Sequence, residues 1–508
     1  MNFANFVDLA ARNAAVKPAV GDETELLTHA ELSERTAAAA NALASLGVEA
    51  GDRVAVCLSN GVPFLTAHLG AMKLGAVSVP VNTRLNVPQV RYVLDTSDVT
   101  VLVTDAAFAD VAAGVETAVT VDGSVGHDYR ELLDDAAETF AVEPRRSDEL
   151  AEVVYTSGTT GRPKGVRHTH GNLLANALGI VTYFDLTRTD VGLTACQCFH
   201  VTGLNVTTTP LLVAEAENRL LPSWDPAAAL AAIENHGVTC TFLTPGMLID
   251  LVDHDAVDRY DVSALETVCV GGTPMPTGRV DDAETALGCP VLEGYGMTET
   301  TPLAAFNRPG DDRKRGSVGP PAREVVELRV EDLETGRAVD RGERGELAWR
   351  GDTVTPGYER LQHDSAAFVE RHGERWLRSG DVGYLDDEGY LHVVDRREDM
   401  FTTGCGNVFP REIEDILYDL EGVAAAAVID ARDDIRGAVV TAIVRPVDDL
   451  APGDSDLAAE RVREVCEERL EPHEVPRRVE FVDELPRTAT GKIDRVALRE
   501  AFGTTKSP

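Results

Sequence analysis

Residues 155–166 read Tyr-Thr-Ser-Gly-Thr-Thr-Gly-Arg-Pro-Lys-Gly-Val and combine hydroxyls, glycines and one lysine in a short stretch. The apolar residues 153–155 lead into it and predict a buried strand. Small residues after a strand let backbone amides turn toward an anion, to which hydroxyls add donors and Lys164 adds charge. An ordinary glycine-rich turn is the alternative, because a short glycine motif is weak on its own. We predict a phosphate-binding loop formed by Thr156, Ser157, Gly158, Thr159, Thr160, Gly161 and Lys164.

This loop is not the common P-loop of nucleotide-binding proteins. The P-loop requires a glycine, four residues of any type, and then Gly-Lys-Ser or Gly-Lys-Thr. Here the fifth residue after Gly158 is Pro163, and Gly165 follows Lys164 instead of preceding it. The P-loop NTPases are therefore excluded.

A second polar motif, Glu293-Gly-Tyr-Gly-Met-Thr-Glu299, comes at the end of a strand predicted over residues 290–293. In open α/β sheets, ligands bind at the carboxyl ends of the strands. There Tyr295 could stack on a purine, Thr298 could bond a phosphate and Glu299 could hold Mg²⁺. The alternative is a polar loop without a ligand.

Two further motifs could hold parts of a nucleotide. Gly271-Gly-Thr-Pro274 follows the apolar residues 268–270, and its double glycine lets a flat ring lie against the backbone. By itself it is equally typical of a tight turn. Trp376-Leu-Arg-Ser-Gly-Asp381 ends in a carboxylate, which can accept hydrogen bonds from the two vicinal hydroxyls of a ribose. The alternative for Asp381 is a solvent-facing side chain in a turn.

Lys492 lies in the glycine-bearing loop Pro486-Arg-Thr-Ala-Thr-Gly-Lys492 near the end of the chain. Only six of the 47 basic residues are lysines. A lysine kept where arginine is otherwise preferred indicates a need for a compact point charge. An ordinary surface lysine is the alternative.

In their order along the chain, the five motifs resemble the signatures of the AMP-forming acyl-CoA synthetases and their relatives, the adenylate-forming enzymes, over almost the whole chain. The resemblance implies that Lys492 bridges the substrate carboxylate and the α-phosphate, that Thr298 and Glu299 assist it, and that Mg²⁺ is held by Glu299 and Thr156. It also implies that ATP contacts the predicted loop together with Gly272, Thr273, Pro274, Glu293, Gly294, Tyr295, Gly296, Asp381 and Arg396.

The resemblance extends to the second half of the reaction. Phe199-His200-Val-Thr-Gly203 is similar to the motif beside the family's acyl tunnel, where His200 would act as a gate. Without the resemblance, His200 would be interpreted as a core histidine. Gly404 would line the pantetheine tunnel of CoA, although the two residues after it depart from the usual Gly-Glu. Glu398 takes the position of the hinge about which the small domain of such enzymes rotates.

Short helices and strands alternate along the first part of the chain, with helices predicted at 29–46 and 63–74 and strands at 53–58 and 76–81. Such alternation is typical of a parallel sheet with helices on its faces. Later stretches predict the start of a helix at 168–174, a strand at 236–243 and a small β-rich unit at 323–350. We expect an α/β fold with a large N-terminal domain of parallel-type sheets and flanking helices, which includes the β-rich unit. The expected parts are an N-terminal domain 1–394, a hinge 395–399 and a small mobile α+β C-terminal domain 400–508.

The charge of the chain limits its partners. With 85 acidic and 47 basic residues, the formal charge is −38, which repels nucleic acid and anionic membranes. The eight cysteines form no Cys-x-x-Cys pair, and no apolar run approaches the roughly 18 residues of a membrane span, so we expect a cytoplasmic protein. Acidic excess with few lysines resembles the proteins of salt-loving archaea and favours a haloarchaeal source. An acidic enzyme of a mesophile is the alternative.

The expected activity is that of an acid–thiol ligase, an AMP-forming acyl-CoA synthetase that uses ATP, Mg²⁺ and coenzyme A. Apolar residues near His200, Leu204 and 241–247 would line the acyl pocket, which favours a medium- or long-chain fatty acid. Aryl acids such as o-succinylbenzoate stay open, and so does an adenylating enzyme that loads a separate carrier protein. A non-catalytic nucleotide sensor is disfavoured by the intact Lys492, Glu299 and Asp381. We expect small-molecule partners, no nucleic acid and no stable membrane insertion, and a homodimer is compatible with the sequence.

Overall fold

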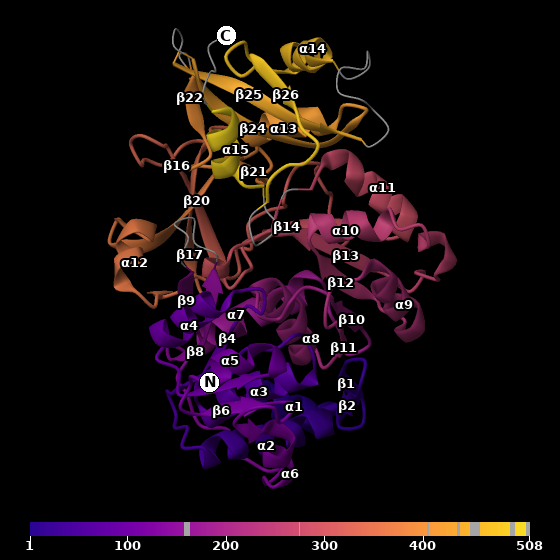
Figure 1. Cartoon of the computed structure of the whole chain (residues 1–508), viewed down its shortest axis with the longest axis vertical. Coiled ribbons are helices and arrows are strands. Elements are labelled where there is room, and N and C mark those ends of the chain that lie inside the picture. Colours follow the sequence, from indigo (N-terminus) through magenta and orange to yellow (C-terminus); the bar gives the residue numbers. More distant parts are fainter. Residues whose placement is uncertain are drawn as a thin grey trace. The chain divides into compact units, whose positions relative to one another are not determined.

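The computed structural model describes residues 1–156, 163–273, 275–403, 406–433, 437–447, 458–487 and 493–503. The chain separates into two compact units (Figure 1). Unit 1 comprises Met1–Leu328 and Trp349–Leu377, and unit 2 comprises Arg329–Ala348 and Arg378–Pro508. The chain passes between the units within three strands, β16 (Val326–Glu331), β17 (Gly345–Gly351) and β20 (Glu374–Leu385). The predicted boundary and hinge at 395–399 stay a prediction.

The first sheet of unit 1 has eight strands in the order β18-β9-β8-β4-β3-β5-β6-β7. The strands from β8 to β7 run parallel, and β9 and β18 are antiparallel additions at one edge. Their bounds are β3 (Arg53–Val56), β4 (Val77–Pro80), β5 (Val101–Thr104), β6 (Ala118–Thr120), β7 (His127–Asp128), β8 (Leu150–Thr156), β9 (Lys164–Thr169) and β18 (Gly357–Tyr358).

The second sheet of unit 1 also has eight strands, in the order β15-β14-β13-β12-β10-β11-β1-β2. Its six inner strands are parallel, and the two edge strands, β15 and β2, are antiparallel. Their bounds are β1 (Pro18–Gly21), β2 (Leu26–Thr28), β10 (Val191–Thr194), β11 (Glu217–Leu220), β12 (Cys240–Leu243), β13 (Thr267–Gly271), β14 (Val291–Tyr295) and β15 (Ala305–Phe306).

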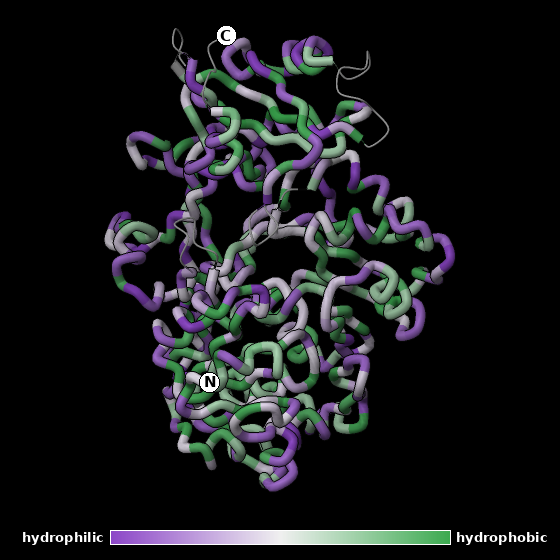
Figure 2. The backbone as a smooth tube through the Cα atoms, in the orientation of Figure 1, coloured by the Kyte–Doolittle hydropathy of each residue, from purple (hydrophilic) through white to green (hydrophobic). Residues whose placement is uncertain are grey.

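Helices cover both faces of the first sheet. Alternate residues of its strands therefore enter different cores. Val54 and Val56 pack in a core with α2 (His29–Ser45) and α3 (Val62–Leu74), whereas Ala55 packs in a second core. Such two-sided burial explains why the strands read as continuous apolar runs. Figure 2 shows hydrophobic colour mostly in the interior of unit 1 and hydrophilic colour on its outer loops. The other α-helices of unit 1 are α1 (Asn5–Ala14), α4 (Val87–Thr96), α5 (Ala109–Ala112), α6 (Tyr129–Asp134), α7 (His170–Tyr183), α8 (Thr209–Val213), α9 (Pro226–His236), α10 (Pro245–Val252), α11 (Thr277–Leu287) and α12 (Leu361–Ala367).

Short helical turns and one more strand complete unit 1. Strand β19 (Phe368–Arg371) pairs antiparallel with the first residues of β20. The turns are η1 (Ala106–Phe108), the π-helix η2 (Thr202–Thr208), η3 (Val257–Arg259) and η4 (Thr298–Thr300).

Unit 2 has a core between a three-stranded sheet and two helices. In the order β24-β25-β26, the first pair is antiparallel and the second is parallel. One face of the sheet packs against α13 and α14, with Val462 and Cys466 fully buried. The elements of this unit are β21 (Leu391–Arg396), β22 (Phe401–Thr403), β23 (Gly406–Val408), α13 (Pro410–Tyr418), β24 (Val423–Asp433), β25 (Gly437–Pro446), α14 (Ala459–Arg469), β26 (Arg478–Phe481) and α15 (Arg495–Phe502).

The α/β class with a large N-terminal part is confirmed, and two local expectations are wrong. The helix expected from 168 begins only at His170, where Thr169 caps it, because residues 164–169 form the antiparallel strand β9. The strand expected over 236–243 begins only at Cys240, because His236 is the last residue of α9 and Gly237 ends that helix at a φ of 60°. Apolar residues lie on both sides of each boundary, so the sequence pattern did not show where the helix or the strand begins.

Candidate active site

Two predicted motifs meet at the carboxyl edge of the second sheet. Gly271 at the end of β13 lies opposite Gly294 in β14, so the segments that follow both strands emerge next to each other. Gly272 has a φ of 87°, a conformation that favours glycine. A Cβ on Gly296 would lie 1.5 Å from the carbonyl oxygen of Pro302, so only glycine fits there. This edge is where the family resemblance places the adenine.

Tyr295 lies at the end of β14, and one face of its ring is occupied. The ring stacks on the buried Trp349, with centroids 5.8 Å apart and planes 27° from parallel. Trp349 therefore fixes the orientation of the aromatic side chain that we predicted to stack on a purine. Pairs of aromatic rings favour such an offset arrangement.

The turn η4 carries Thr298 and Glu299, both of which are buried. The carboxylate of Glu299 accepts a 2.8 Å hydrogen bond from the Tyr358 hydroxyl, and its backbone carbonyl accepts one of 2.9 Å from the Thr355 amide. The turn ends at Thr301, whose φ of 59° is unusual for a β-branched residue. Backbone strain of this kind persists where surrounding contacts hold it, and it clusters at functional sites.

The strands on either side of the predicted phosphate loop, β8 and β9, pair antiparallel. Thr156 and Lys164, at the two ends of the loop, are paired across the strands. Gly165 allows the close approach of Tyr155, since a Cβ there would lie 2.9 Å from its ring. The loop residues between these ends, Ser157, Gly158, Thr159, Thr160 and Gly161, lie outside the described residues.

The hairpin also holds two buried residues that we did not predict as functional. Glu152 on β8 faces His168 on β9, and His168 also reaches the carbonyl oxygen of Thr298. The sequence contained a signal for them, because an acidic residue inside the apolar run 151–155 has to find a partner when it is buried.

His200 is exposed, so the alternative of a core histidine is wrong. Its Nδ1 accepts a 3.2 Å hydrogen bond from the Thr202 amide at the start of η2. A Cβ on Gly203 would lie 2.4 Å from the Cys196 carbonyl oxygen, so glycine lets this helix pack on the preceding segment. Leu204, expected near the acyl pocket, is fully buried with Cys198 in the core of the first sheet.

The segments before η2 and after β12 come together, as the predicted acyl pocket requires. The Cys196 thiol lies 3.6 Å from the Phe242 carbonyl oxygen and 3.7 Å from the Met247 sulfur. Burial raises the pKa of Cys196 to about 12, so it stays a neutral thiol. Thr244 caps α10 between them. These residues could form an apolar wall of the predicted acyl pocket, and the neutral Cys196 thiol is not a nucleophile there.

In unit 2, Asp381 and Arg396 form a pair across strands β20 and β21. The Arg396 Nε lies 2.7 Å from Asp381 Oδ1, and the Asp381 side chain is nearly buried whereas Arg396 is half exposed. The Ser379 hydroxyl accepts a 3.0 Å hydrogen bond from the Asp381 amide and donates one of 2.9 Å to the Leu347 carbonyl oxygen. The hydroxyl of Ser379 therefore supports the turn that carries the predicted ribose ligand.

Three of the predicted residues lie outside the described parts of the chain in addition to the loop. These are Pro274, Gly404 and Lys492. Glu398, the predicted hinge residue, is exposed in the turn after β21.

Oxygen ligands for Mg²⁺ are available, although the described residues contain no group of three His, Cys, Asp or Glu side chains that could hold a metal ion. Magnesium in phosphoryl-transfer sites usually takes one or two protein oxygens and completes its shell with phosphates and water. The buried carboxylate of Glu299 and the hydroxyl of Thr156 are oxygen donors of that kind. The donor set fits Mg²⁺ that arrives with ATP.

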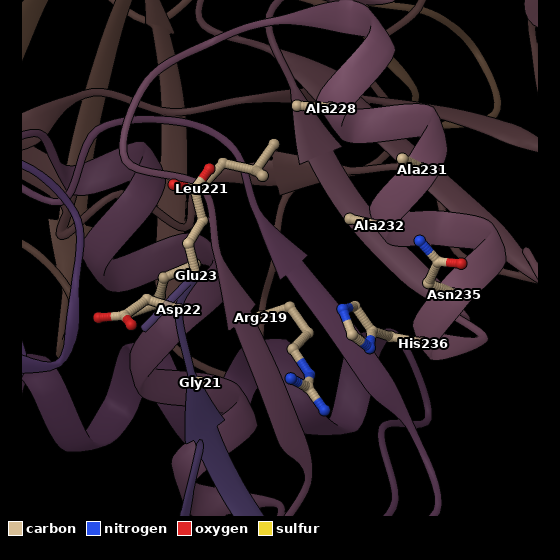
Figure 3. A pocket seen from close by; sticks show the side chains of 11 residues that line it. Gly21, Asp22, Glu23, Arg219, Leu221, Ala228, Ala231, Ala232, Asn235 and His236 are labelled. Atoms are coloured by element: carbon tan, nitrogen blue, oxygen red, sulfur yellow. The ribbon is translucent and has the colours of Figure 1, made fainter. Parts of the chain in front are cut away.

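A separate pocket of about 250 Å³ lies between β1, β11 and α9 (Figure 3). Arg219 and His236 both line it, but none of the predicted site residues does. Arg219 is already paired with Glu217 at 2.6 Å, and burial lowers the pKa of His236. We assign the pocket no role in catalysis. No helix within the described parts of the chain combines the length and apolarity needed to cross a membrane.

Comparison with known proteins agrees with this arrangement. Residues 7–359 match the family described as AMP-binding enzyme, and residues 412–492 match the AMP-binding enzyme C-terminal domain. Feruloyl-CoA synthase from Amycolatopsis sp is 37% identical over 94% of both chains. ATP-bound MatB from Rhodopseudomonas palustris superimposes with a TM-score of 0.90 at 30% identity and 99% of both chains. The o-succinylbenzoate CoA synthetase MenE from Bacillus subtilis, in complex with ATP and magnesium ion, gives a TM-score of 0.85 at 30% identity over 97% of this chain and 99% of that chain.

The chain belongs to the AMP-binding enzyme family. It is an AMP-forming acyl- or aryl-CoA synthetase that uses ATP, Mg²⁺ and coenzyme A. The expected enzyme class and cofactors are confirmed.

Proposed function

We propose that the enzyme activates an aromatic carboxylic acid and transfers it to coenzyme A. The observation that carries this proposal is the identity of 37% to a feruloyl-CoA synthase over 94% of the chain. The similarity to o-succinylbenzoate CoA synthetase points to the same class of acid. The fatty acid that the apolar pocket residues favoured finds no support among these relatives.

The first step is adenylation. The acid attacks the α-phosphate of ATP and forms acyl-AMP and pyrophosphate, which converts a poor acylating agent into one with a good leaving group. Mg²⁺ supplies charge neutralisation of the phosphates. The proposed roles are phosphate binding by the loop 156–164, metal binding by Glu299 and Thr156, and charge stabilisation by Lys492. Asp381 and Arg396 are assigned to the ribose end of the nucleotide.

The second step is attack of the CoA thiol on the acyl carbonyl, with AMP as the leaving group. We assign Gly404 to the CoA side and His200 to the passage between the two sites. One active site has to serve both steps, so we assign Glu398 as the hinge for rotation of residues 400–508.

Proline fixes φ near −65°, so Glu398→Pro is expected to keep acid-dependent pyrophosphate exchange and to lose thioester formation from supplied acyl-AMP. Undiminished thioester formation would remove Glu398 from the hinge role.

The substrate class is tested by one screen. Purified enzyme is given ATP, Mg²⁺ and CoA with ferulate, 4-coumarate, 2-succinylbenzoate, indoleacetate, octanoate or palmitate, and AMP release and CoA thioester are measured. We expect kcat/KM for at least one aromatic acid to exceed that of either fatty acid by a factor of about 100, a difference of about 2.7 kcal/mol in transition-state binding. A fatty acid with the highest kcat/KM would contradict the proposal.

The same screen also measures whether CoA accepts the acyl group, against the carrier-protein thiol that the sequence left open. Formation of aryl-CoA at rates that match AMP release supports CoA as the acceptor. Release of AMP without thioester would show that the acyl-AMP is hydrolysed and would count against CoA as the acceptor.

We also propose that the protein works in the cytoplasm at high salt concentration. The formal charge of −38 and the scarcity of lysine support adaptation to salt. Seven cysteines lie in the described residues, and all are free thiols, which supports a reducing compartment.

A further inference from the structure

Glu152 and His168 form a buried pair inside the hairpin that carries the phosphate loop. They lie opposite each other on β8 and β9, and neither side chain is exposed to solvent. His168 Nδ1 lies 2.8 Å from Glu152 Oε1. The same carboxylate oxygen accepts a 2.6 Å hydrogen bond from the Asn205 amide.

The other ring nitrogen of His168 points to the second catalytic motif. Its Nε2 lies 2.7 Å from the carbonyl oxygen of Thr298, the first residue of η4. The next residue, Glu299, carries the carboxylate assigned to Mg²⁺. One side chain thus connects the strand that leaves the phosphate loop with the turn that holds the proposed metal ligand.

Both neighbours of the His168 ring are hydrogen-bond acceptors. A carbonyl oxygen only accepts, and an ionised carboxylate also only accepts. Burial opposes the charge on Glu152, but the hydrogen bond and charge of His168, with help from His68 and Asn205, hold the pKa of Glu152 below its ordinary value. The ring satisfies both acceptors only when each nitrogen carries a proton.

A second contact ties the same strand to the same turn. Thr355 donates its hydroxyl to the Arg167 carbonyl oxygen at 2.5 Å and its amide to the Glu299 carbonyl oxygen at 2.9 Å. Strand β9 therefore reaches both residues of the catalytic turn, one through a side chain and one through Thr355.

We propose that His168, oriented by Glu152, is a positioning residue that holds the Thr298–Glu299 turn in register with the phosphate-loop hairpin during adenylation. The inference rests on the roles proposed above for the loop, Thr298 and Glu299. The alternative is a buried ion pair that contributes to folding only, because buried pairs are often replaceable by apolar residues without loss of stability.

The first test is Glu152→Gln. Glutamine keeps the size of the side chain, and its oxygen still accepts from His168 Nδ1 and Asn205. The Asn205 amide holds the glutamine oxygen toward Nδ1, so a neutral ring carries its one proton on Nδ1. Nε2 then presents a lone pair to the Thr298 carbonyl, and the turn loses its anchor. We expect kcat for acid-dependent pyrophosphate exchange to fall at least tenfold with KM for the acid within twofold. Thioester formation from supplied acyl-AMP and CoA is expected to stay within twofold.

Ser78→Ala is the matched control. It removes the 2.8 Å hydrogen bond between the Ser78 hydroxyl and His68 Nδ1, which is equally buried and belongs to the same polar cluster but does not reach Thr298. Both variants are expected to lower Tm by a similar amount, and only Glu152→Gln is expected to slow exchange. Equal exchange rates in the two variants would overturn the proposal, and so would equal losses of both half-reactions in Glu152→Gln.

The double variant Glu152→Leu/His168→Leu keeps the proposal testable if the single variant folds poorly. It replaces both charges by apolar groups and is expected to recover the Tm, but not the exchange rate, because nothing then holds the Thr298 carbonyl. Wild-type Tm together with wild-type exchange would overturn the proposal. The wild-type enzyme is assayed first with the fastest acid of the screen. Absence of exchange there would contradict the proposed function itself, whereas exchange that is insensitive to these variants contradicts only the positioning role.

Discussion

The Tyr358 hydroxyl donates a 2.8 Å hydrogen bond to the carboxylate of Glu299, and both side chains are buried. Burial and the neighbouring negative charge raise the pKa of Tyr358, so the phenol remains a donor over the whole working range of pH. Tyr358 lies on β18, which pairs with β9 of the phosphate-loop hairpin. The hydrogen bond therefore sets the direction of the proposed Mg²⁺ ligand from the sheet that carries the predicted phosphate loop.

Tyr358→Phe removes this hydrogen bond and keeps the ring. A hydrogen bond to a charged group contributes about 1.5–3 kcal/mol, so we expect kcat for pyrophosphate exchange to fall by a factor of about 10 to 100. The control is Tyr183→Phe, which removes a hydrogen bond from a buried tyrosine to the exposed Glu324 away from the site and should leave exchange unchanged. Exchange at the wild-type rate in Tyr358→Phe would show that Glu299 does not need this contact.

The stability of the protein should depend on the protonation of His170. Burial lowers the pKa of His170 from 6.5 to about 4, and the positive charges of Arg145 and the N-terminus act in the same direction. Its Nδ1 accepts a 3.1 Å hydrogen bond from the Phe3 amide, which requires the neutral ring. The unfolded chain takes up a proton near pH 6.5 and the folded chain does not, so stability is lost as the pH falls from about 6.5 to about 4.

His170→Asn should remove this part of the pH dependence, since the amide oxygen can still accept from Phe3 and does not titrate. From pH 7.5 to pH 5, the wild type should lose about 2 kcal/mol more stability than the variant. The measurement is the shift of Tm between the two pH values, at one KCl concentration. Parallel Tm curves would contradict the assignment of a neutral buried His170.

The candidate site was selected from sequence because its motifs combine unusual residue types at fixed spacing, and the roles of its residues stay predictions. Glu299, Asp381 and Lys164 were singled out by the chemistry of their neighbours. The partners of these residues from distant segments could not be predicted. Tyr358 and Trp349 lie on strands whose apolar sequence is equally typical of residues that only fill a core. The same holds for strand β9, because residues of both alternating sets are buried and no apolar–polar alternation marks the strand.

Salt should stabilise the protein. The 85 acidic and 47 basic residues leave a strongly negative surface, and added ions screen like charges over a Debye length of about 10 Å at 0.1 M and about 3 Å at 1 M. We expect Tm to rise by about 5 °C or more from dilute buffer to 2 M KCl. An equal osmolality of sucrose is the control for solvent exclusion. A Tm that is flat or falling in KCl would reject the salt-adapted assignment.

Lys492→Ala should separate the two steps. If the lysine bridges the substrate carboxylate and the α-phosphate, its loss should reduce pyrophosphate exchange by about 100-fold or more, in the range of other electrostatic groups that stabilise developing charge. Conversion of supplied acyl-AMP and CoA to thioester should stay within about threefold. Lys314→Ala, at another of the few lysines, is the control for loss of a positive charge. Equal losses in both half-reactions would assign Lys492 a structural role.

The central claim is that the chain forms an aryl-AMP before CoA takes part, and pyrophosphate exchange tests it most directly. Labelled pyrophosphate is incubated with enzyme, ATP and Mg²⁺ in the absence of CoA, with and without each acid of the screen. We predict incorporation of label into ATP that depends on an aromatic acid, followed by aryl-CoA and AMP in equal amounts when CoA is added. Exchange that needs no acid, or no exchange with any acid although CoA-dependent thioester forms, would contradict the account.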